Sequence, residues 1–225
     1  MSRKMKALVC VAHPDDETIF FGGVIQAKKY DWTAVCVTDA NADGFGQERY
    51  KQFQKACRKL GIQKTIFLNY PDLFDQRLDA KKLSADLKKL GTFDVVYTHG
   101  VLGEYGHIHH QDVCFAVFQT FAKTSKIYSP AYNIFPQIKV PLSQKAYNLK
   151  TAILSDIYAG ESMRFLGLLP ATSFEGFVQL ENSEVEEIYL HILKKKKLNK
   201  KKLKTYAWLA DYIARHDYQL KLRPF

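Results

Sequence analysis

The chain has 225 residues, of which 47% are apolar and 25% are charged, and these values are typical of a globular protein of one α/β domain. No apolar stretch approaches the ~20 residues that a transmembrane helix needs. The net charge of +10 is concentrated at the end of the chain, where residues 189–225 hold 11 Lys or Arg and 2 Asp or Glu.

The four cysteines do not form a Cys-x-x-Cys pair, and Cys10 and Cys36 lie in apolar, strand-like runs. This pattern indicates neither a disulfide framework nor a cysteine-based zinc site, so we expect free thiols in a reduced cytoplasmic compartment. The apolar run near the N-terminus covers only residues 7–12, which is too short for a secretory signal. We expect one domain over residues 1–225, with residues 184–225 as its basic helical extension.

Strands and helices are predicted to alternate along most of the chain. In chain order we expect a strand at 7–12, a helix at 18–30, a strand at 33–38, a helix at 47–60, a strand at 65–68, a helix at 79–90, a strand at 95–99, a helix from 107 or 109 to 122, a strand at 126–129 and a helix at 144–158. Asp15 and Asp16 suit the start of the first helix, and Gly61 suits the end of the second. Residues 160–183 are ambiguous.

This alternation predicts a Rossmann-like α/β fold, with a mostly parallel sheet and helices on both faces. In such open sheets, ligands bind beyond the carboxyl ends of the strands. Two polar clusters follow predicted strands, so we expect the active site there.

The first cluster is His13-Pro14-Asp15-Asp16-Glu17, directly after the first strand. Helix capping would explain one or two of the acids. It would not explain the histidine or three crowded negative charges, which repel one another unless a cation neutralises them. A bound metal explains this cluster better.

The second cluster is Gly103-Glu104-Tyr105-Gly106-His107-Ile108-His109-His110, shortly after the fourth strand. His107 and His110 are three residues apart and share one face of a helical turn, whereas His109 points elsewhere. Two histidines and a carboxylate are a common ligand set for catalytic zinc, which leaves a fourth position for water.

Together these motifs resemble the LmbE/PIG-L family of zinc-dependent N-deacetylases, over about residues 7–117. A further match is Arg49 with Ala56, Leu60 and Gly61, which resembles the family's arginine-led second helix. Two positions depart from the family pattern: His109 stands where Asp, Asn or Gln is frequent, and Gln52 where an acid is frequent.

The resemblance implies a role for each matching residue. The implied zinc ligands are His13, Asp16 and His110, the general base is Asp15, the groups near the oxyanion are His107 and Tyr105, and the residues on the substrate side are Arg49 and Glu17. The implied cofactor is one Zn²⁺, although another divalent metal suits the same ligands.

The predicted function is therefore removal of an N-acetyl group from an amino-sugar-like substrate. The alternatives are a zinc amidase for non-sugar acyl amines and an inactive basic binding protein. The lysines at 194–204 suit a solvated helix face or a flexible linker better than a nucleic-acid site, and attraction to an anionic membrane surface is a third alternative. Aromatic and apolar residues follow these lysines and would either anchor a helix at the membrane surface or pack on the body of the protein. They are Tyr206, Trp208, Leu209, Tyr212 and Ile213. The sequence leaves the oligomeric state open.

Overall fold

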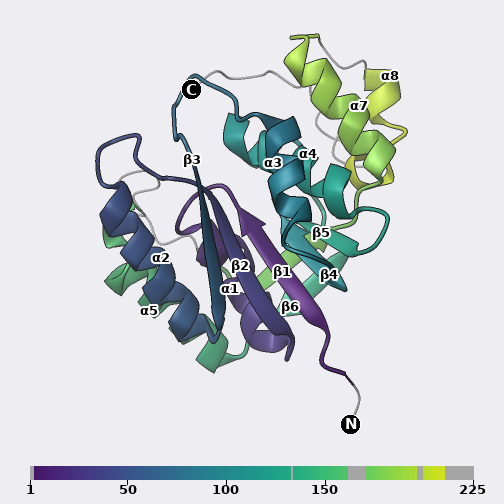
Figure 1. Cartoon of the computed structure of the whole chain (residues 1–225). Coiled ribbons are helices and arrows are strands. Elements are labelled where there is room, and N and C mark those ends of the chain that lie inside the picture. Colours follow the sequence, from purple (N-terminus) through teal and green to yellow (C-terminus); the bar gives the residue numbers. More distant parts are fainter. Residues whose placement is uncertain (1–2, 133, 162–170, 197–199, 211–225) are drawn as a thin grey trace. The chain divides into compact units, whose positions relative to one another are not determined.

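The computed structural model in Figure 1 describes residues 3–132, 134–161, 171–196 and 200–210. Its strands are β1 (Lys6–Val11), β2 (Asp31–Thr38), β3 (Lys64–Tyr70), β4 (Val95–Thr98), β5 (Lys126–Pro130), β6 (Ile138–Pro141) and β7 (Phe174–Val178). Its helices are α1 (Asp16–Ala27), α2 (Gly46–Leu60), α3 (Ala80–Lys88), α4 (Ile108–Phe121), α5 (Gln144–Asp156), α7 (Asn182–Leu193) and α8 (Lys200–Leu203).

The strands form one seven-stranded sheet in the order β3-β2-β1-β4-β5-β7-β6. β1 pairs with β2 in parallel, as does β2 with β3, whereas β5 and β7 pair antiparallel. The expected α/β fold with a mostly parallel sheet is thereby confirmed. The antiparallel β7 lies in a segment that the sequence left ambiguous, and β6 was not expected.

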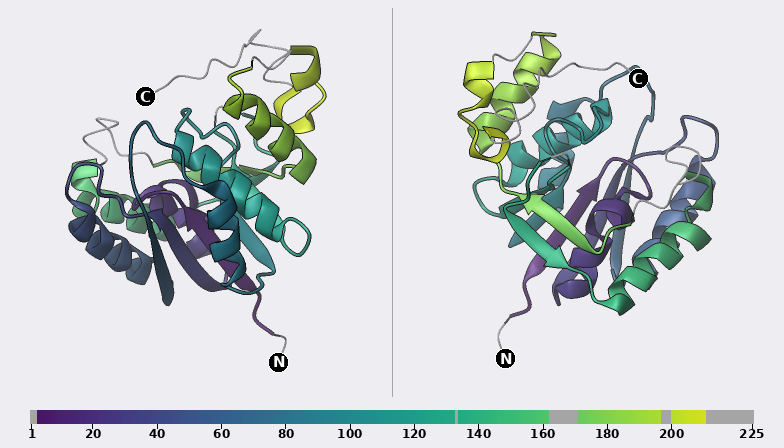
Figure 2. Two further views of the ribbon diagram at one scale, coloured as in Figure 1. Left: turned by 45° about the horizontal axis from the view of Figure 1, so that its top comes forward. Right: turned by 180° about the vertical axis from the view of Figure 1, so that it is seen from behind.

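The chain divides into two compact units, of which the first comprises Met1–Phe74, Phe93–Tyr97 and Lys139–Glu175. Its core is formed by β1 and β2, which are buried along almost their whole length. Helices α1, α2 and α5 of this unit contact one another (Figures 1 and 2). Gly23 on α1 permits a close approach, because a Cβ there would lie 2.6 Å from Leu142 and 2.8 Å from Glu175.

The second unit comprises Asp75–Thr92, Thr98–Ile138 and Gly176–Phe225. Its helix α4 packs against α3 and α7 (Figure 2). Tyr206, Trp208 and Leu209 are buried, and the indole N–H of Trp208 donates a hydrogen bond to Glu184 at 2.9 Å. These three side chains therefore pack within the protein and are not membrane anchors, whereas Tyr212 and Ile213 lie outside the described residues.

Several boundaries differ from the sequence-based expectation. Helix α1 begins at Asp16, two residues earlier than expected, and Asp15 at its N-cap makes no side-chain capping bond. Gly61 ends α2 with a φ of 85°, as expected for a left-handed C-cap. All four cysteines are free and buried, including Cys10 and Cys36, which the sequence placed in apolar strands. Within the described residues, no helix is long and apolar enough to cross a membrane.

Candidate active site

The turn after β1 holds the first cluster in a strained conformation. Asp15 has a φ of 101°, which is rare for any residue other than glycine. Two acids brace this turn: Asp16 accepts the main-chain N–H of His13 at 3.0 Å, and Glu17 accepts that of Asp15 at 3.0 Å. Backbone strain of this kind is typical of functional sites.

His13 lies between two carboxylates of the same unit. Its Nδ1 is 3.5 Å from Asp16 Oδ2, and its Nε2 is 3.5 Å from Asp72 Oδ1. Burial acts to lower the pKa of His13, but the hydrogen bonds and charges of Asp16 and Asp72 outweigh burial and raise it to about 10. The two carboxylates therefore favour a positive charge at this position.

Asp15 and Glu17 have perturbed acidity for related reasons. Burial, and then the charges of Asp16 and Glu17, raise the pKa of Asp15 well above its ordinary value. Burial raises the pKa of Glu17 to about 7, against the hydrogen bonds donated by Thr18 and Tyr158. Glu17 is fully buried, and its contacts with Thr18, Tyr158 and the main-chain N–H of Asp15 brace the turn.

Arg49, on α2, is also buried, and its guanidinium is held by acids. It forms an ion pair with Glu161, lies 3.6 Å from Asp43, and donates to the carbonyl of Ala40 at 3.5 Å. The acidic partners would hold the guanidinium in a fixed orientation, which suits a group that recognises a ligand.

In the second unit, the turn after β4 is organised by Glu104, whose side chain is fully buried. Its Oε1 accepts the main-chain N–H of Gly100 at 2.7 Å. Its Oε2 lies 3.1 Å from His99 Nδ1 and 2.6 Å from His110 Nδ1. Burial acts to raise the pKa of Glu104, but the charge of His99 and the hydrogen bonds from His110 and His99 outweigh it and lower the pKa to about 2.

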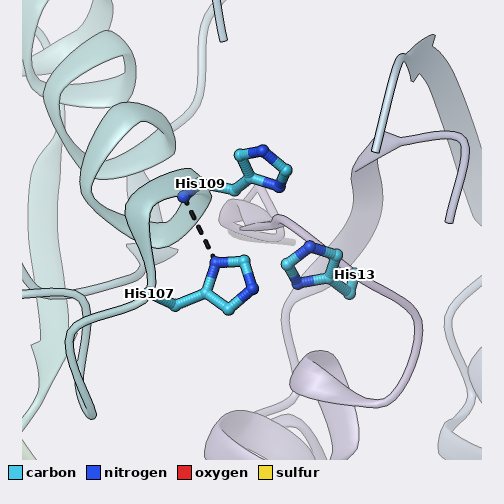
Figure 3. A group of neighbouring side chains, drawn as sticks. All are labelled: His13, His107 and His109. Atoms are coloured by element: carbon cyan, nitrogen blue, oxygen red, sulfur yellow. Dashed lines mark hydrogen bonds between the residues drawn. The ribbon is translucent and has the colours of Figure 1, made fainter. Parts of the chain in front are cut away.

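His107 and His110 share one face at the start of α4, as the spacing predicted. Their rings stack with centroids 4.7 Å apart and an angle of 24° between the ring planes. His107 is the N-cap of α4, and its Nδ1 accepts the main-chain N–H of His109 at 3.2 Å (Figure 3). The ring of His109 instead meets the carbonyl oxygen of Gln76, 2.9 Å from its Nε2.

Tyr105 is 45% exposed and stands beside these histidines. Its ring centroid is 5.3 Å from that of His110 and 6.0 Å from that of His107, with edge-to-face geometry in both cases. A half-exposed tyrosine next to two histidines can present its hydroxyl to a ligand in solvent.

The structure thus groups the predicted residues by unit. The first unit brings together His13, Asp15, Asp16 and Glu17, and the second brings together Tyr105, His107 and His110. The roles of Asp72 and Glu104 were missed. Asp72 follows β3, so the strand-end argument applied to the first and fourth strands would have found it. Glu104 lies inside the second motif, but no sequence pattern indicates which histidines it holds.

The fold and these clusters define an α/β protein with histidines and carboxylates in the segments that follow β1, β3 and β4. A family model described as PIG-L: GlcNAc-PI de-N-acetylase matches residues 8–121, and the chain belongs to this family. The matched segment contains both polar clusters.

Among curated proteins, the chain is 30% identical over 119 residues to a probable N-acetylglucosaminyl-phosphatidylinositol de-N-acetylase of Dictyostelium discoideum, covering 48% of this chain and 46% of that protein. A Schizosaccharomyces pombe protein with the same description is 29% identical over 146 residues, with coverages of 57% and 58%. The chain therefore spans about half the length of the curated relatives it matches.

Solved structures show the same fold. An N,N'-diacetylchitobiose deacetylase from Pyrococcus horikoshii matches with a TM-score of 0.60 and 22% identity, over 80% of this chain and 85% of that one. The zinc-inhibited form of the teicoplanin deacetylase Orf2 matches with a TM-score of 0.62 and 11% identity, over 78% and 98% of the two chains.

Proposed function

We propose that this chain is a zinc-dependent N-deacetylase that hydrolyses the acetamide of an N-acetylglucosamine-type substrate. The observation that carries the proposal is the family match over residues 8–121, because this segment includes both the acid turn and the histidine cluster. The names of the curated relatives and of the structural neighbours support the same reaction class.

The residues that would hold the ion are His13, Asp16 and His110. Two imidazoles and one carboxylate fit zinc, which commonly takes three protein ligands and keeps one position open in catalytic sites. Because Nδ1 of His110 bonds Glu104, Nε2 is the ring nitrogen that would coordinate the ion. When bound, a divalent ion lowers the pKa of a water molecule and polarises a carbonyl oxygen.

Asp15 is the proposed general base, which removes a proton from the attacking water. Because its pKa is raised, Asp15 accepts a proton more readily near neutral pH than an ordinary aspartate does. The same proton, or one from His107, then passes to the nitrogen of the departing amine.

His107 is suited to stabilise the negative oxygen of the tetrahedral intermediate. Since its Nδ1 accepts the N–H of His109, the ring proton of the neutral imidazole is placed on Nε2, which becomes a hydrogen-bond donor. The hydroxyl of Tyr105 would add a second donor. Arg49 would contact the substrate, and Glu17 would support the turn that carries Asp15.

The proposal is tested by measuring acetate release from N-acetylglucosamine, N,N'-diacetylchitobiose and N-acetylglucosaminyl-phosphatidylinositol. The protein is stripped of metal with a chelator and then restored with Zn²⁺, and iron and cobalt are compared with zinc. We expect release from at least one sugar only after metal is restored.

Two alternatives predict different results in this assay. A zinc amidase for non-sugar acyl amines would release acetate from simple N-acetyl amines and from none of the sugars. A basic binding protein that lacks activity would bind zinc and hydrolyse no amide, and this result would overturn the proposal.

A further inference from the structure

Glu104 is the one acid within the second histidine cluster, and it contacts two histidines at once. One of its oxygens, Oε2, lies 3.1 Å from His99 Nδ1 and 2.6 Å from His110 Nδ1. The other oxygen is held by the N–H of Gly100. The side chains of His99, Glu104 and His110 have no exposed surface, so these bonds form away from bulk water.

Glu104 and His110 are too close together to be ligands of one ion through these atoms. Ligand atoms of His99, Glu104 and His110 lie within 4.8 Å of one another, which at first suggests a separate metal site. However, two ligands bound at ~2.0–2.1 Å in a tetrahedral zinc site stand about 3.3 Å apart. The 2.6 Å separation of Glu104 Oε2 and His110 Nδ1 is instead that of a short charge-assisted hydrogen bond.

This hydrogen bond decides which nitrogen of His110 is a donor. An ionised carboxylate only accepts hydrogen bonds, so Nδ1 of His110 must carry the proton. Nε2 then presents its lone pair, and the ring cannot flip without losing its partner. Histidines that bind metals commonly have such a carboxylate on their other nitrogen.

The backbone around Glu104 is shaped to deliver this carboxylate. Glu104 has a φ of 51° and the preceding Gly103 a φ of 71°. A Cβ at Gly103 would lie 2.4 Å from the carbonyl oxygen of His107, so only glycine fits there. A left-handed conformation at a non-glycine residue is unfavourable, and here it turns the Glu104 side chain back toward the histidines.

His99 completes the arrangement by packing against the face of the His110 ring. Its imidazole stacks on that of His110, with centroids 3.7 Å apart and an angle of 19° between the planes. The main-chain carbonyl of His99 accepts the hydroxyl of Ser129 at 2.8 Å, which ties this residue to β5. His99 therefore limits tilting of the His110 ring, while Glu104 limits its rotation.

We propose that Glu104 is a positioning residue, which orients His110 as a metal ligand by holding its Nδ1 and which is itself fixed by His99 and the Gly100 amide. Glu104 would supply the support that an acid at position 109 could otherwise give, since His109 is engaged with the carbonyl of Gln76. This inference rests on the proposed function, because it requires His110 to bind the ion.

The test measures metal affinity and not activity alone. Zn²⁺ affinity of the full chain is determined by competition with a chromogenic chelator, and the visible absorption spectrum of the Co²⁺-loaded protein reports ligand geometry. We expect Glu104→Gln to weaken Zn²⁺ binding by roughly 10- to 100-fold and to change the Co²⁺ spectrum, because the amide is a neutral and weaker acceptor.

Asp112→Asn is the matched control, since Asp112 is a buried acid on α4, the helix that carries His110. It accepts bonds from Arg77, the N–H of Leu78 and the hydroxyl of Tyr189. Asp112→Asn should lower the thermal unfolding midpoint while leaving the Zn²⁺ affinity of the folded protein within about twofold of the original. A purely structural role for Glu104 would give the same result for Glu104→Gln and would overturn the inference.

If Glu104→Gln does not fold, Glu104→Asp replaces it, because this variant keeps the charge but retracts the carboxylate by one methylene. Lower Zn²⁺ affinity with an altered Co²⁺ spectrum supports the inference, and unchanged values overturn it. If the unmodified chain binds no metal, or binds metal but releases no acetate, the proposed function fails at that step. If the unmodified chain binds metal and releases acetate, and the Glu104 variant keeps the original Zn²⁺ affinity and Co²⁺ spectrum, only the inference about Glu104 fails.

Discussion

The ammonium of Lys150 lies 2.7 Å from Glu175 Oε1, and the two side chains are 1% and 4% exposed. Lys150 also donates to the carbonyl of Ile19 at 2.7 Å, and Glu175 accepts the N–H groups of Gly23 and Val24. This pair connects α5 and β7 to α1, the helix that begins at the acid turn. It therefore braces α1, whose first turn carries Asp16 and Glu17.

We expect Lys150→Met to lower the free energy of unfolding by about 3–5 kcal/mol, because it leaves the buried Glu175 without its cation. Lys150→Met combined with Glu175→Gln should lose less, since no uncompensated charge remains. Lys145→Met, at an exposed position of the same helix, should change stability by less than about 0.5 kcal/mol. Urea unfolding measures all three, and equal effects at positions 150 and 145 would contradict the expectation.

The acidity of Glu175 predicts a pH dependence of stability. Burial raises its pKa above the ordinary value, although Lys150 and two main-chain N–H groups oppose the shift. As the pH rises, the Glu175 carboxyl of the folded protein thus keeps its proton after the unfolded chain has lost it at about pH 4.3. Stability from this group is fully present below that pH and is lost as the pH rises through the folded pKa.

Glu175→Gln should remove this decline. The measurement is the free energy of unfolding as a function of pH from about 4 upward, for the original chain and the variant. Glu17, whose pKa is about 7, contributes a slope of the same sign in both proteins, so the difference between the curves isolates Glu175. Parallel curves would show that Glu175 does not titrate as described.

Asp15→Asn should keep the metal and lose roughly 10²- to 10⁴-fold in activity, because an amide cannot accept the proton of the attacking water. Asparagine tolerates a positive φ, so the turn at position 15 should persist. Metal content by elemental analysis and acetate release measure the two effects, and Asp31→Asn, at an exposed position of β2, serves as the control. Loss of metal in Asp15→Asn would make Asp15 a ligand and reassign the base.

His110→Ala should lose bound metal, because it removes one of three proposed protein ligands. His191→Ala, on α7, changes a histidine whose ring nitrogen meets the carbonyl of Glu187 and should keep full metal content. Elemental analysis after purification in defined Zn²⁺ gives the result. Full retention in His110→Ala would move the ligand to His107 or His109.

The last prediction concerns the hypothesis that the basic segment binds an anionic membrane surface, and it uses residues at the end of α7. Lys194, Lys195 and Lys196 are exposed, next to Leu190 and Leu193, which are 39% and 43% exposed. At about 1 kcal/mol per lysine near an anionic surface, changing all three to Gln should weaken binding to phosphatidylserine vesicles by roughly 100-fold. Vesicle co-sedimentation at several salt concentrations measures this.

The matched control changes Lys51, Lys55 and Lys59 to Gln, which removes the same charge from exposed positions of α2. Equal losses in the two triple variants would show a general charge effect. Binding to DNA in place of vesicles would favour the nucleic-acid reading.

Much of this protein is determined locally and was therefore predictable. The parallel strands follow from continuous apolar runs, because a strand buried on both faces can carry few polar residues. The acid turn directly follows β1 and the histidine cluster comes shortly after β4, so their positions could be derived from the sequence alone. The stacking of His107 and His110 follows from the spacing of three residues.

Other features depend on contacts between distant segments, and only the tertiary structure decided them. The short strand β7 contains glycine and glutamate and has no strand-like pattern of its own; its pairing with β5, Ser129 opposite Val178, defines it. Asp72 meets His13 across 59 positions of the chain, and Lys150 meets Glu175 where the low dielectric of the interior makes unpaired charges costly. Glu104 was visible in the sequence, but its two histidine partners depend on a left-handed turn that no residue pattern specifies, because such strained conformations are maintained by the packing around them.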